Sequence, residues 1–229
     1  MTTQSPVRLE AALKVTGQAV YPAETPAEGM LHAALVESPV AAGEVRAVDA
    51  HAARRMAGVA DVVSYAETAV LAPSRVTSLI REPVIHFAGQ PVALVAAETL
   101  LQARHAARAV QVDIAAHPTV TNLDQALDQA YAPAMNGRIP LDSQRGDVAT
   151  GLADAALVVR QRYETAANNH HPMEPHAVVC AWQDGKATTH TTTQAVFSTR
   201  YIMARAFQVP LEDVRVITRF VSGDSSTSN

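Results

Sequence analysis

The organisation of the chain is clearest between residues 91 and 114, which read PVALVAAETLLQARHAARAVQVDI. Pro91 to Ala97 is an apolar run of the length expected for a buried strand. An alanine-rich segment from about Thr99 to Ala109 favours a helix, and Val110 to Ile114 returns to a strand pattern. A strand, a helix and a second strand in succession indicate a module of mixed α and β structure.

The residues before Pro91 extend this module with shorter elements. A turn at Ser38-Pro39 separates two predicted strands, and Gly58 is placed to end a helical segment. The predicted elements are strands at Met30–Glu37, Gly43–Asp49 and Val59–Tyr65 and a helix at Ala50–Met56. The mixed pattern therefore begins well upstream of Pro91.

The periodicity weakens from His117 to about Arg145. Within this segment only Leu123 to Tyr131 favours a short helix. The signals that interrupt the pattern are Pro118, Pro133, Pro140 and the turn dipeptide Asn136-Gly137. We predict a linker here and a second module that starts at about residue 141.

The second module opens with a predicted helix at about Asp147–Asp154, followed by a predicted strand at Ala155–Thr165. Asp147 stands at the start of the helix, where its carboxylate can accept a hydrogen bond from a backbone N–H. The same residue completes Arg145-Gly146-Asp147, an adhesion tripeptide. Because a cytoplasmic protein has no use for such a tripeptide, we favour the capping role.

A hairpin and a helix are predicted next. Asp184-Gly185 suits a two-residue turn with positive φ between strands at Ala177–Gln183 and Lys186–Thr193. Apolar residues then recur every three or four positions, which indicates one face of a helix. They are Phe197, Tyr201, Ala204 and Phe207, after which Pro210 precedes a final predicted strand at Val214–Val221.

The composition excludes several classes of protein. A chain of 229 residues with 48% hydrophobic and 17% charged residues is expected to form a soluble globular protein. Its net charge of −4 and scattered basic residues argue against nucleic-acid binding. Residues 1–6 lack the basic and apolar regions of a signal peptide, and no apolar run approaches the roughly 18 residues of a membrane span. We expect a cytoplasmic protein without membrane contact.

Cys180 is the only cysteine of the chain. A single thiol excludes an internal disulfide and an iron–sulfur cluster held by four cysteines of this chain. Because Cys180 lies in an alternating strand beside Trp182, we expect a buried and inert side chain.

The densest polar cluster consists of His170, His171, Glu174 and His176. Imidazoles beside a carboxylate raise the hypothesis of a metal site. Pro172 interrupts any helix on which such ligands could converge, so we favour a structured loop and assign no metal ligand. The sequence also contains no G-x-S-x-G, G-x-x-x-x-G-K-[ST] or G-x-G-x-x-G motif.

A family resemblance is carried by short segments that follow one another in order. They are Lys14-Val-Thr-Gly17 with Tyr21, Gly29-Met-Leu-His32 with Ser38-Pro39, Glu82-Pro83, Phe87-Ala-Gly-Gln-Pro-Val-Ala93, Arg145-Gly-Asp147, His171-Pro-Met-Glu-Pro-His176, Trp182 before Asp184-Gly185, Gln194, and Val214-Arg-Val-Ile217 with Phe220-Val221. No single segment is decisive. Their collinear order resembles the molybdenum-binding large subunit of the xanthine dehydrogenase and aldehyde oxidase family.

The resemblance implies an α+β fold in which the family's α/β hammerhead domain is followed by an incomplete molybdopterin-binding domain. The expected boundaries are a hammerhead domain over residues 1–117, a linker over residues 118–144, and the N-terminal fragment of the molybdopterin-binding domain over residues 145–229. The strands and helices predicted above are compatible with this assignment.

In the complete family enzyme, a molybdenum-pterin cofactor supports hydroxylation of an aldehyde or N-heterocycle carbon with oxygen from water. Electrons then pass through two [2Fe–2S] clusters to FAD, so the resemblance implies iron–sulfur and FAD subunits or domains as partners. Gln194 falls where the family places a glutamine that hydrogen-bonds the molybdenum oxo ligand, a task for which a neutral amide donor is suited. The alternative is that Gln194 only closes the corner between hairpin and helix.

The sequence departs from the family after Phe220-Val221. The family has a glycine-rich cofactor loop there, whereas this chain reads Ser222-Gly-Asp-Ser-Ser-Thr-Ser-Asn229. Asp224 would bring a carboxylate toward an anionic cofactor, and no carboxylate of this chain matches the family's glutamate general base by motif. We therefore expect a truncated or frameshifted oxidoreductase subunit that retains no cofactor alone, and we assign no catalytic residue. The alternative is a non-catalytic interaction module or split subunit that binds iron–sulfur or flavin partners or a separately encoded C-terminal half.

Overall fold

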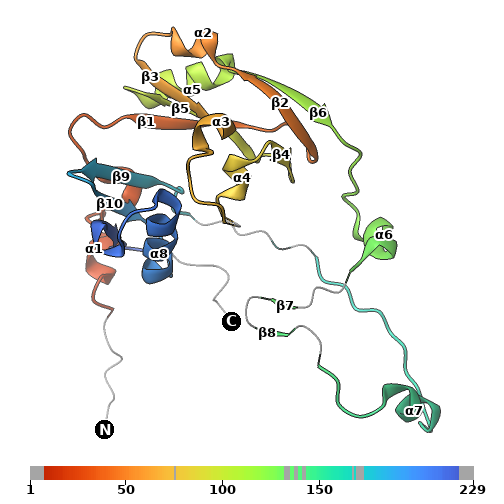
Figure 1. Cartoon of the computed structure of the whole chain (residues 1–229). Coiled ribbons are helices and arrows are strands. Elements are labelled where there is room, and N and C mark those ends of the chain that lie inside the picture. The colour runs from red at the N-terminus through yellow and green to blue at the C-terminus, as the bar shows by residue number, and fades with distance from the viewer. Residues whose placement is uncertain are drawn as a thin grey trace, which may run out of the picture. The chain divides into compact units, whose positions relative to one another are not determined.

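A computed structural model of the chain describes residues 8–74, 76–131, 135–136, 139–140, 143–166, 168 and 173–221 (Figure 1). The strands in these residues are β1 (His32–Glu37), β2 (Gly43–Asp49), β3 (Val59–Ser64), β4 (Val84–Ile85), β5 (Pro91–Ala97), β6 (Gln111–Ala116), β7 (Met135–Asn136), β8 (Ile139–Pro140), β9 (Val178–Gln183), β10 (Lys186–Thr191) and β11 (Val214–Ile217). The α-helices are α1 (Ala11–Val15), α2 (His51–Arg54), α3 (Tyr65–Thr68), α4 (Ser78–Arg81), α5 (Leu100–Ala109), α6 (Leu123–Ala126), α7 (Val148–Ala153) and α8 (Val196–Phe207). Short 3₁₀ helices are η1 (Pro22–Glu24), η2 (Leu127–Gln129) and η3 (Leu211–Asp213).

Internal contacts divide the chain into two units. One unit comprises residues 1–118 together with residues 170–229, and the other comprises residues 119–169. The first unit therefore brings together segments that are separated in the sequence by the whole of the second. No helix among the described residues is long and apolar enough to cross a membrane.

Residues 32–116 form two three-stranded antiparallel sheets around one core. Their strand orders are β1-β5-β3 and β4-β2-β6. Helix α5 packs across β1 and β5, as the predicted strand, helix and strand succession requires (Figure 1). Small side chains such as Ala106 on α5 allow close approach to Val62 and Val95, and all three are at most 1% exposed.

Helix α5 begins at a side-chain cap, and the residue before this cap is bonded to the turn at Gly58. The Thr99 hydroxyl accepts a hydrogen bond from the backbone N–H of Gln102 at 3.2 Å. Gly58 has φ +80° and ends the segment that contains α2, so the chain can turn into β3. The backbone N–H of Glu98 donates to the Gly58 carbonyl at 2.9 Å and joins the two turns.

Gln90 is the largest fully buried side chain among the described residues, with 1% exposure. Its Oε1 accepts a hydrogen bond from the backbone N–H of His86 at 2.8 Å. Its Nε2 donates to the carbonyls of Val84 at 2.8 Å and Leu79 at 3.2 Å. One amide therefore satisfies three backbone groups and fixes the segment between α4 and β5.

Residues 178–217 form a third three-stranded sheet with the order β11-β10-β9. Strands β9 and β10 are an antiparallel hairpin whose turn residues Asp184 and Gly185 have φ +51° and +78°, as a type I′ turn requires. Strands β10 and β11 are parallel, so a crossover must connect them. Helix α8 supplies it and packs against β11.

The N-terminal segment, residues 8–26, lies against this third sheet and the residues that follow it. Lys14 Nζ donates to the carbonyl of Val221 at 2.8 Å. The rings of Tyr21 and Phe220 have centroids 5.9 Å apart, and η1 contacts β9. The start of the chain thus forms one layer over the C-terminal part of the described residues.

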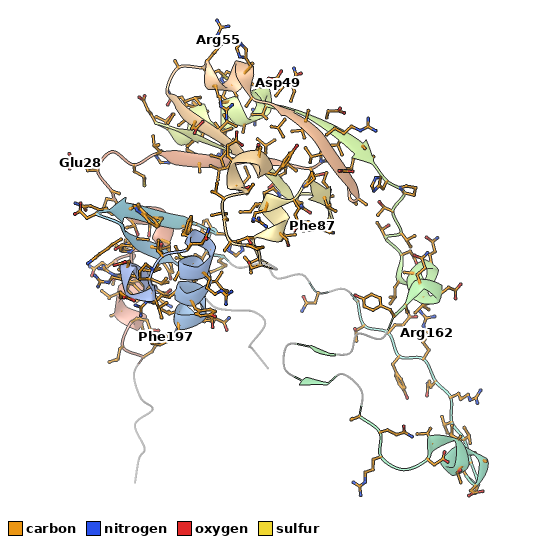
Figure 2. The ribbon with its side chains drawn as sticks, in the orientation of Figure 1. Glu28, Asp49, Arg55, Phe87, Arg162 and Phe197 are labelled. Carbon is orange, nitrogen blue, oxygen red and sulfur yellow. The ribbon has the colours of Figure 1, made fainter. Side chains whose placement is uncertain are left out.

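The second unit has little internal packing in its described residues. Asp147 caps α7 by accepting a hydrogen bond from the backbone N–H of Thr150 at 3.1 Å. Hydrogen bonds from the Thr150 backbone and hydroxyl lower the pKa of Asp147. Arg162 (Figure 2) forms an ion pair with Asp124 at 3.0 Å. The described side chains of this unit are almost all exposed, which leaves it without a core of its own.

Most of the predicted elements are confirmed. The strand at Pro91–Ala97, the capped helix that follows, the Asp184-Gly185 hairpin and the Asp147 cap all occur as expected. The helix predicted at Ala50–Met56 is shorter, the one at Leu123–Tyr131 divides into α6 and η2, and the last strand ends at Ile217. Gly137 lies outside the described residues, so the expected Asn136-Gly137 turn is not described.

Two predictions were wrong. Residues 155–165 do not form a strand, although Val158, Val159 and Tyr163 favour one, because a strand needs a partner and the described residues offer none there. Cys180 is exposed and not buried. It lies on β9, an edge strand whose side chains are almost all exposed, so the alternation did not report a buried face.

Candidate functional site

The candidate site is the threonine loop, residues 191–194, which leads from β10 to α8. It follows the carboxyl end of β10, which runs parallel to β11. Loops at the carboxyl ends of parallel strands are preferred positions for ligand-binding residues. The chain reads Thr191-Thr-Thr-Gln194 here, so three hydroxyl groups precede one amide.

Three hydrogen bonds hold the threonine loop in place. The Thr218 hydroxyl, beyond β11, donates to the carbonyl of Thr191 at 2.7 Å. The Thr192 hydroxyl donates to the carboxylate of Glu174, which is only 8% exposed. The Thr193 hydroxyl accepts from the backbone N–H of Ala195 at 3.1 Å. The loop is therefore tied to β11, to residue 174 and to the first turn of α8.

Gln194 is the exposed residue at the end of this fixed loop. It precedes Ala195, the N-cap of α8, and the cap makes no side-chain hydrogen bond. The amino end of a twelve-residue helix carries partial positive charge that favours an anion nearby. Gln194 can add two neutral N–H donors without introducing a net charge.

A second support of the helix lies on its buried side. The Thr193 and Thr199 hydroxyl oxygens are 3.2 Å apart, which links the loop to the first turn of α8. Arg200 Nε donates to the carbonyls of Leu211 at 3.0 Å and Val214 at 2.7 Å. These bonds fix α8 relative to η3 and β11, so the position of residue 194 does not depend on the loop alone.

The histidine-rich cluster is only partly described. His170 and His171 lie outside the described residues, while His176 is exposed. Glu174 is buried and engages the threonine loop, which agrees with a structured loop whose polar groups are satisfied. Among the described residues no group of three His, Cys, Asp or Glu side chains could hold a metal ion. Sequence reasoning found this cluster but not its contact with Thr192, because residues 174 and 192 are distant in the chain.

Beside Glu174 lies an open pocket of about 330 Å³. It is lined by Tyr21, Ala23, Glu24, Met173, Glu174 and Pro175. The N-terminal segment therefore contributes one wall, which the sequence analysis did not predict. The signal was present in Tyr21, one of the family-like residues, but its partner Phe220 is recognisable only in three dimensions.

The arrangement agrees with comparisons to known proteins. Residues 16–118 match the family described as aldehyde oxidase and xanthine dehydrogenase, a/b hammerhead domain. Residues 131–223 match the family described as molybdopterin cofactor-binding domain. The chain thus carries both kinds of sequence in the order that the resemblance implied.

Individual proteins of known class are similar to the same extent of the chain. The chain is 31% identical over 220 residues to the aldehyde oxidoreductase molybdenum-binding subunit PaoC of Escherichia coli O157:H7, covering 94% of this chain and 30% of that protein. It is 28% identical over 237 residues to the xanthine dehydrogenase molybdenum-binding subunit of the same organism, covering 95% and 31%. Quinoline 2-oxidoreductase from Pseudomonas putida 86 is structurally similar, with a TM-score of 0.79, 26% identity and coverage of 96% and 30%.

The chain belongs to the molybdenum-binding subunits of the xanthine dehydrogenase and aldehyde oxidase family of oxidoreductases, and it combines hammerhead and molybdopterin-binding sequence. It spans about 30% of the length of the curated relatives that it matches. The cofactor of this family is molybdenum-pterin. Both relatives are named as molybdenum-binding subunits.

The described residues fit one part of such a cofactor. An exposed neutral amide at a fixed loop, beside the amino end of α8, is a suitable donor for an oxo ligand. Residues 222–229, where the family's glycine-rich loop was sought, lie outside the described residues. The fit therefore rests on Gln194 and its supporting threonines.

Proposed function

We propose that this chain supplies the hammerhead domain and the Gln194 contact of a molybdenum hydroxylase subunit. The complete enzyme would hydroxylate an aldehyde or an N-heterocycle carbon with oxygen from water. The observation that carries the proposal is the threonine loop, whose three hydrogen bonds hold Gln194 at the carboxyl end of a parallel strand pair. When bound, the cofactor supplies the oxidising centre and the oxo ligand.

The role of Gln194 in the proposal is to donate an amide hydrogen bond to that oxo ligand. The neutral amide stabilises a partial negative charge on the oxo ligand by hydrogen bonding. Because it carries no net charge, it does not also attract buffer anions. The three threonines hold the loop. Thr191 does so through its backbone carbonyl and Thr192 and Thr193 through their hydroxyls, and none of these bonds is to residue 194.

The 229-residue chain is proposed not to retain the cofactor alone. A typical hydrogen bond contributes about 0.5–1.5 kcal/mol net, whereas nanomolar retention requires about 12 kcal/mol. One amide therefore provides a small fraction of the affinity. Most contacts, and the glutamate base implied by the family, would come from other parts of the subunit.

Expression of the chain in a host that makes molybdenum cofactor tests this proposal. We expect no stoichiometric molybdenum by metal analysis and no dye reduction with aldehydes or purines. Near-stoichiometric molybdenum with turnover that disappears in Gln194→Ala, but persists in Gln183→Ala, would overturn it. Gln183 is a matched control because it is an exposed glutamine at the far end of β9.

A chimera tests the role of Gln194 itself. The matched segment of the PaoC subunit is replaced by this chain, and molybdenum content and aldehyde turnover are measured. Gln194→Ala in the chimera is expected to lower turnover at least about tenfold, since side chains that hydrogen-bond the ligands of a metal are typically worth 10–100-fold in affinity or activity. Equal turnover in Gln194→Ala and Gln183→Ala would assign residue 194 to the corner of the fold only.

A second candidate function, a docking module for another polypeptide, is favoured by one observation. The outer face of α8 carries Phe197 (Figure 2), 83% exposed, and Tyr201, 53% exposed. Exposed aromatic side chains on one helix face are typical of a surface that is covered in an assembly. The proposed partners are iron–sulfur or flavin subunits or a separately encoded C-terminal half. Co-purification with such subunits that is lost in Phe197→Asp would support this function.

The domain boundaries are part of the proposal. We place a hammerhead domain at residues 1–117, a linker at residues 118–144 and a molybdopterin-binding portion at residues 145–229. Limited trypsin digestion is expected to cut first at Arg145, which is exposed at the boundary between the linker and the molybdopterin-binding portion. First cleavage at Arg104 within α5 would contradict the boundaries.

A further inference from the structure

We propose that a pocket between the N-terminal segment and strands β10 and β11 binds a small monocarboxylate with a compact apolar body. The pocket has a volume of about 250 Å³. It is lined by Val20, Pro22, Thr25, Pro26, His190, Ile217 and Arg219. It shares no lining residue with the pocket beside Glu174, although residues 20–26 contribute to both, and Gln194 is not among its lining residues.

The topology explains why the polar groups meet here. His190 and Ile217 are register partners on the parallel strands β10 and β11, so they lie side by side. Arg219 follows two residues after Ile217 and lines the same pocket. The opposite wall comes from residues 20–26, which the Tyr21 and Phe220 ring contact holds against the sheet. The pocket is thus assembled from the two ends of the described chain.

The charges in the pocket have one sign. Arg219 is a permanent cation, and the His190 imidazole is always able to donate at least one N–H bond. No Asp or Glu among the described residues lines the pocket. Glu24, the acidic residue of the same wall, accepts a hydrogen bond from the backbone N–H of Tyr21 at 3.0 Å and lines the other pocket. Among the described residues, neither Arg219 nor His190 has a side-chain partner.

Apart from Thr25, the remaining lining residues are apolar and define the body of the ligand. Val20, Pro22, Pro26 and Ile217 present only hydrocarbon side chains. A volume of about 250 Å³ is below the range of about 300–1,000 Å³ that is typical for drug-sized ligands. A carboxylate can pair with the planar guanidinium of Arg219 through two parallel hydrogen bonds. A one-ring carboxylate satisfies charge, size and apolar surface together.

Binding is tested with the full 229-residue chain and four probes, which are benzoate, benzamide, acetate and inorganic phosphate. We expect saturable benzoate binding with a Kd of about 1 mM or tighter in an NMR titration, with shifts at residues 190, 217 and 219. Benzamide lacks the charge and acetate lacks the ring, so each is expected to bind at least about tenfold more weakly. Phosphate is expected to bind more weakly than benzoate because it has no apolar body to place against Val20, Pro26 and Ile217.

Two variants that each remove one arginine show whether benzoate binding depends on a contact with Arg219 or only on the positive charge of this surface. Arg219→Gln is expected to raise the benzoate Kd about tenfold or more. Arg215→Gln removes the same charge from an exposed residue of β11 outside the pocket and is expected to change the Kd less than about twofold. Val20→Phe fills the pocket without changing charge and is expected to abolish binding. Circular dichroism of each variant verifies that the fold is retained.

The proposal is overturned by any of four results. These are no saturable benzoate binding below about 10 mM, equal affinity for benzamide, equal affinity for phosphate, or equal effects of Arg219→Gln and Arg215→Gln. Because all measurements use the chain without molybdenum, they are independent of the proposed oxidoreductase function. Failure of that function would leave the expected benzoate affinity unchanged.

Discussion

Residues 32–116 and residues 173–221 belong to the same unit but differ in how far their apolar side chains are buried. In the first, Val62, Val95 and Ala106 are at most 1% exposed and form part of one continuous core. In the second, Phe197 and Trp182 are at least half exposed, and few side chains such as Val214 are buried. The first part buries its apolar side chains in its own core, whereas the second leaves large apolar side chains exposed.

The largest difference between the two parts is expected when an aspartate replaces an apolar side chain in each of them. Val95→Asp places a charge in the core of residues 32–116 and is expected to cost more than about 4 kcal/mol, enough to unfold that part. Phe197→Asp is expected to change the free energy of unfolding by less than about 0.5 kcal/mol and to reduce aggregation. Urea denaturation followed by circular dichroism measures both. A large loss of stability in Phe197→Asp would show that the α8 face is already packed.

A smaller effect is expected at Gln90. Gln90→Leu removes one acceptor and one donor group, leaving three part-buried backbone groups without this partner, and should cost about 1–3 kcal/mol. Gln183→Leu, at an exposed position of β9, serves as the control and should be nearly neutral. Equal unfolding midpoints for the two variants would mean that the Gln90 bonds contribute nothing net.

The two parts can also be compared through the destabilisation caused by alanine at one glycine in a turn of each part. Gly58 and Gly185 have φ +80° and +78°, so alanine at either position should cost about 1–2 kcal/mol. At Gly58 a Cβ would also meet the Gln102 side chain, whereas at Gly185 it would meet nothing within 4 Å. We expect Gly58→Ala to be the more destabilising in thermal unfolding. The reverse order would indicate that Gln102 moves aside freely and that the hairpin turn is the stiffer of the two.

The smallest effect concerns Glu67, which caps α3. Hydrogen bonds from the Ser64 hydroxyl and the Ser64 backbone N–H, with a contribution from Arg54, lower the pKa of Glu67 from 4.5 to about 2. Because the folded-state pKa is depressed, the ionised carboxylate stabilises the fold above pH 4.5, and this contribution is lost as the pH falls toward 2. The side chain is 45% exposed, so solvent screening limits the effect to less than about 1 kcal/mol.

Denaturation from pH 7 to pH 2.5 checks this dependence. The difference in stability between the unchanged chain and Glu67→Gln should shrink as the pH falls through the range between the two pKa values. Glu98→Gln, a change at an exposed glutamate in the same part of the chain, should show no such trend. A difference that stays constant with pH would exclude the ionised cap as its cause.

The sequence predicted elements whose signals are local. Pro91–Ala97 is long and apolar, Thr99 caps the following helix, and Asp184-Gly185 fits its turn with positive φ, so each is recognisable without knowledge of its neighbours. The short helices α1, α3 and α4 were not predicted, because four or five residues provide too little periodicity. The expected strand at residues 155–165 failed for the opposite reason, since propensity without a partner strand does not suffice.

The candidate site was less accessible to sequence reasoning. Gln194 was found only through the family resemblance, because a lone glutamine after three threonines has no distinctive spacing. The bond between Thr192 and Glu174 joins two segments across the sheet, and the pocket of His190 and Arg219 joins the first and last described parts of the chain. Cys180 was misjudged because alternation predicts a buried face only when something covers it.

The bond between Lys14 and Val221 has a consequence for the order of folding. The two residues are 207 positions apart, so the N-terminal segment cannot reach its place until nearly all of the described chain has been synthesised. At about 5–20 residues per second, this delay is roughly 10–40 s on the ribosome. Residues 32–116 contain their own core and can fold during that interval. Among the described residues, those synthesised first are thus among the last to be buried, and Tyr21 meets Phe220 only late in synthesis.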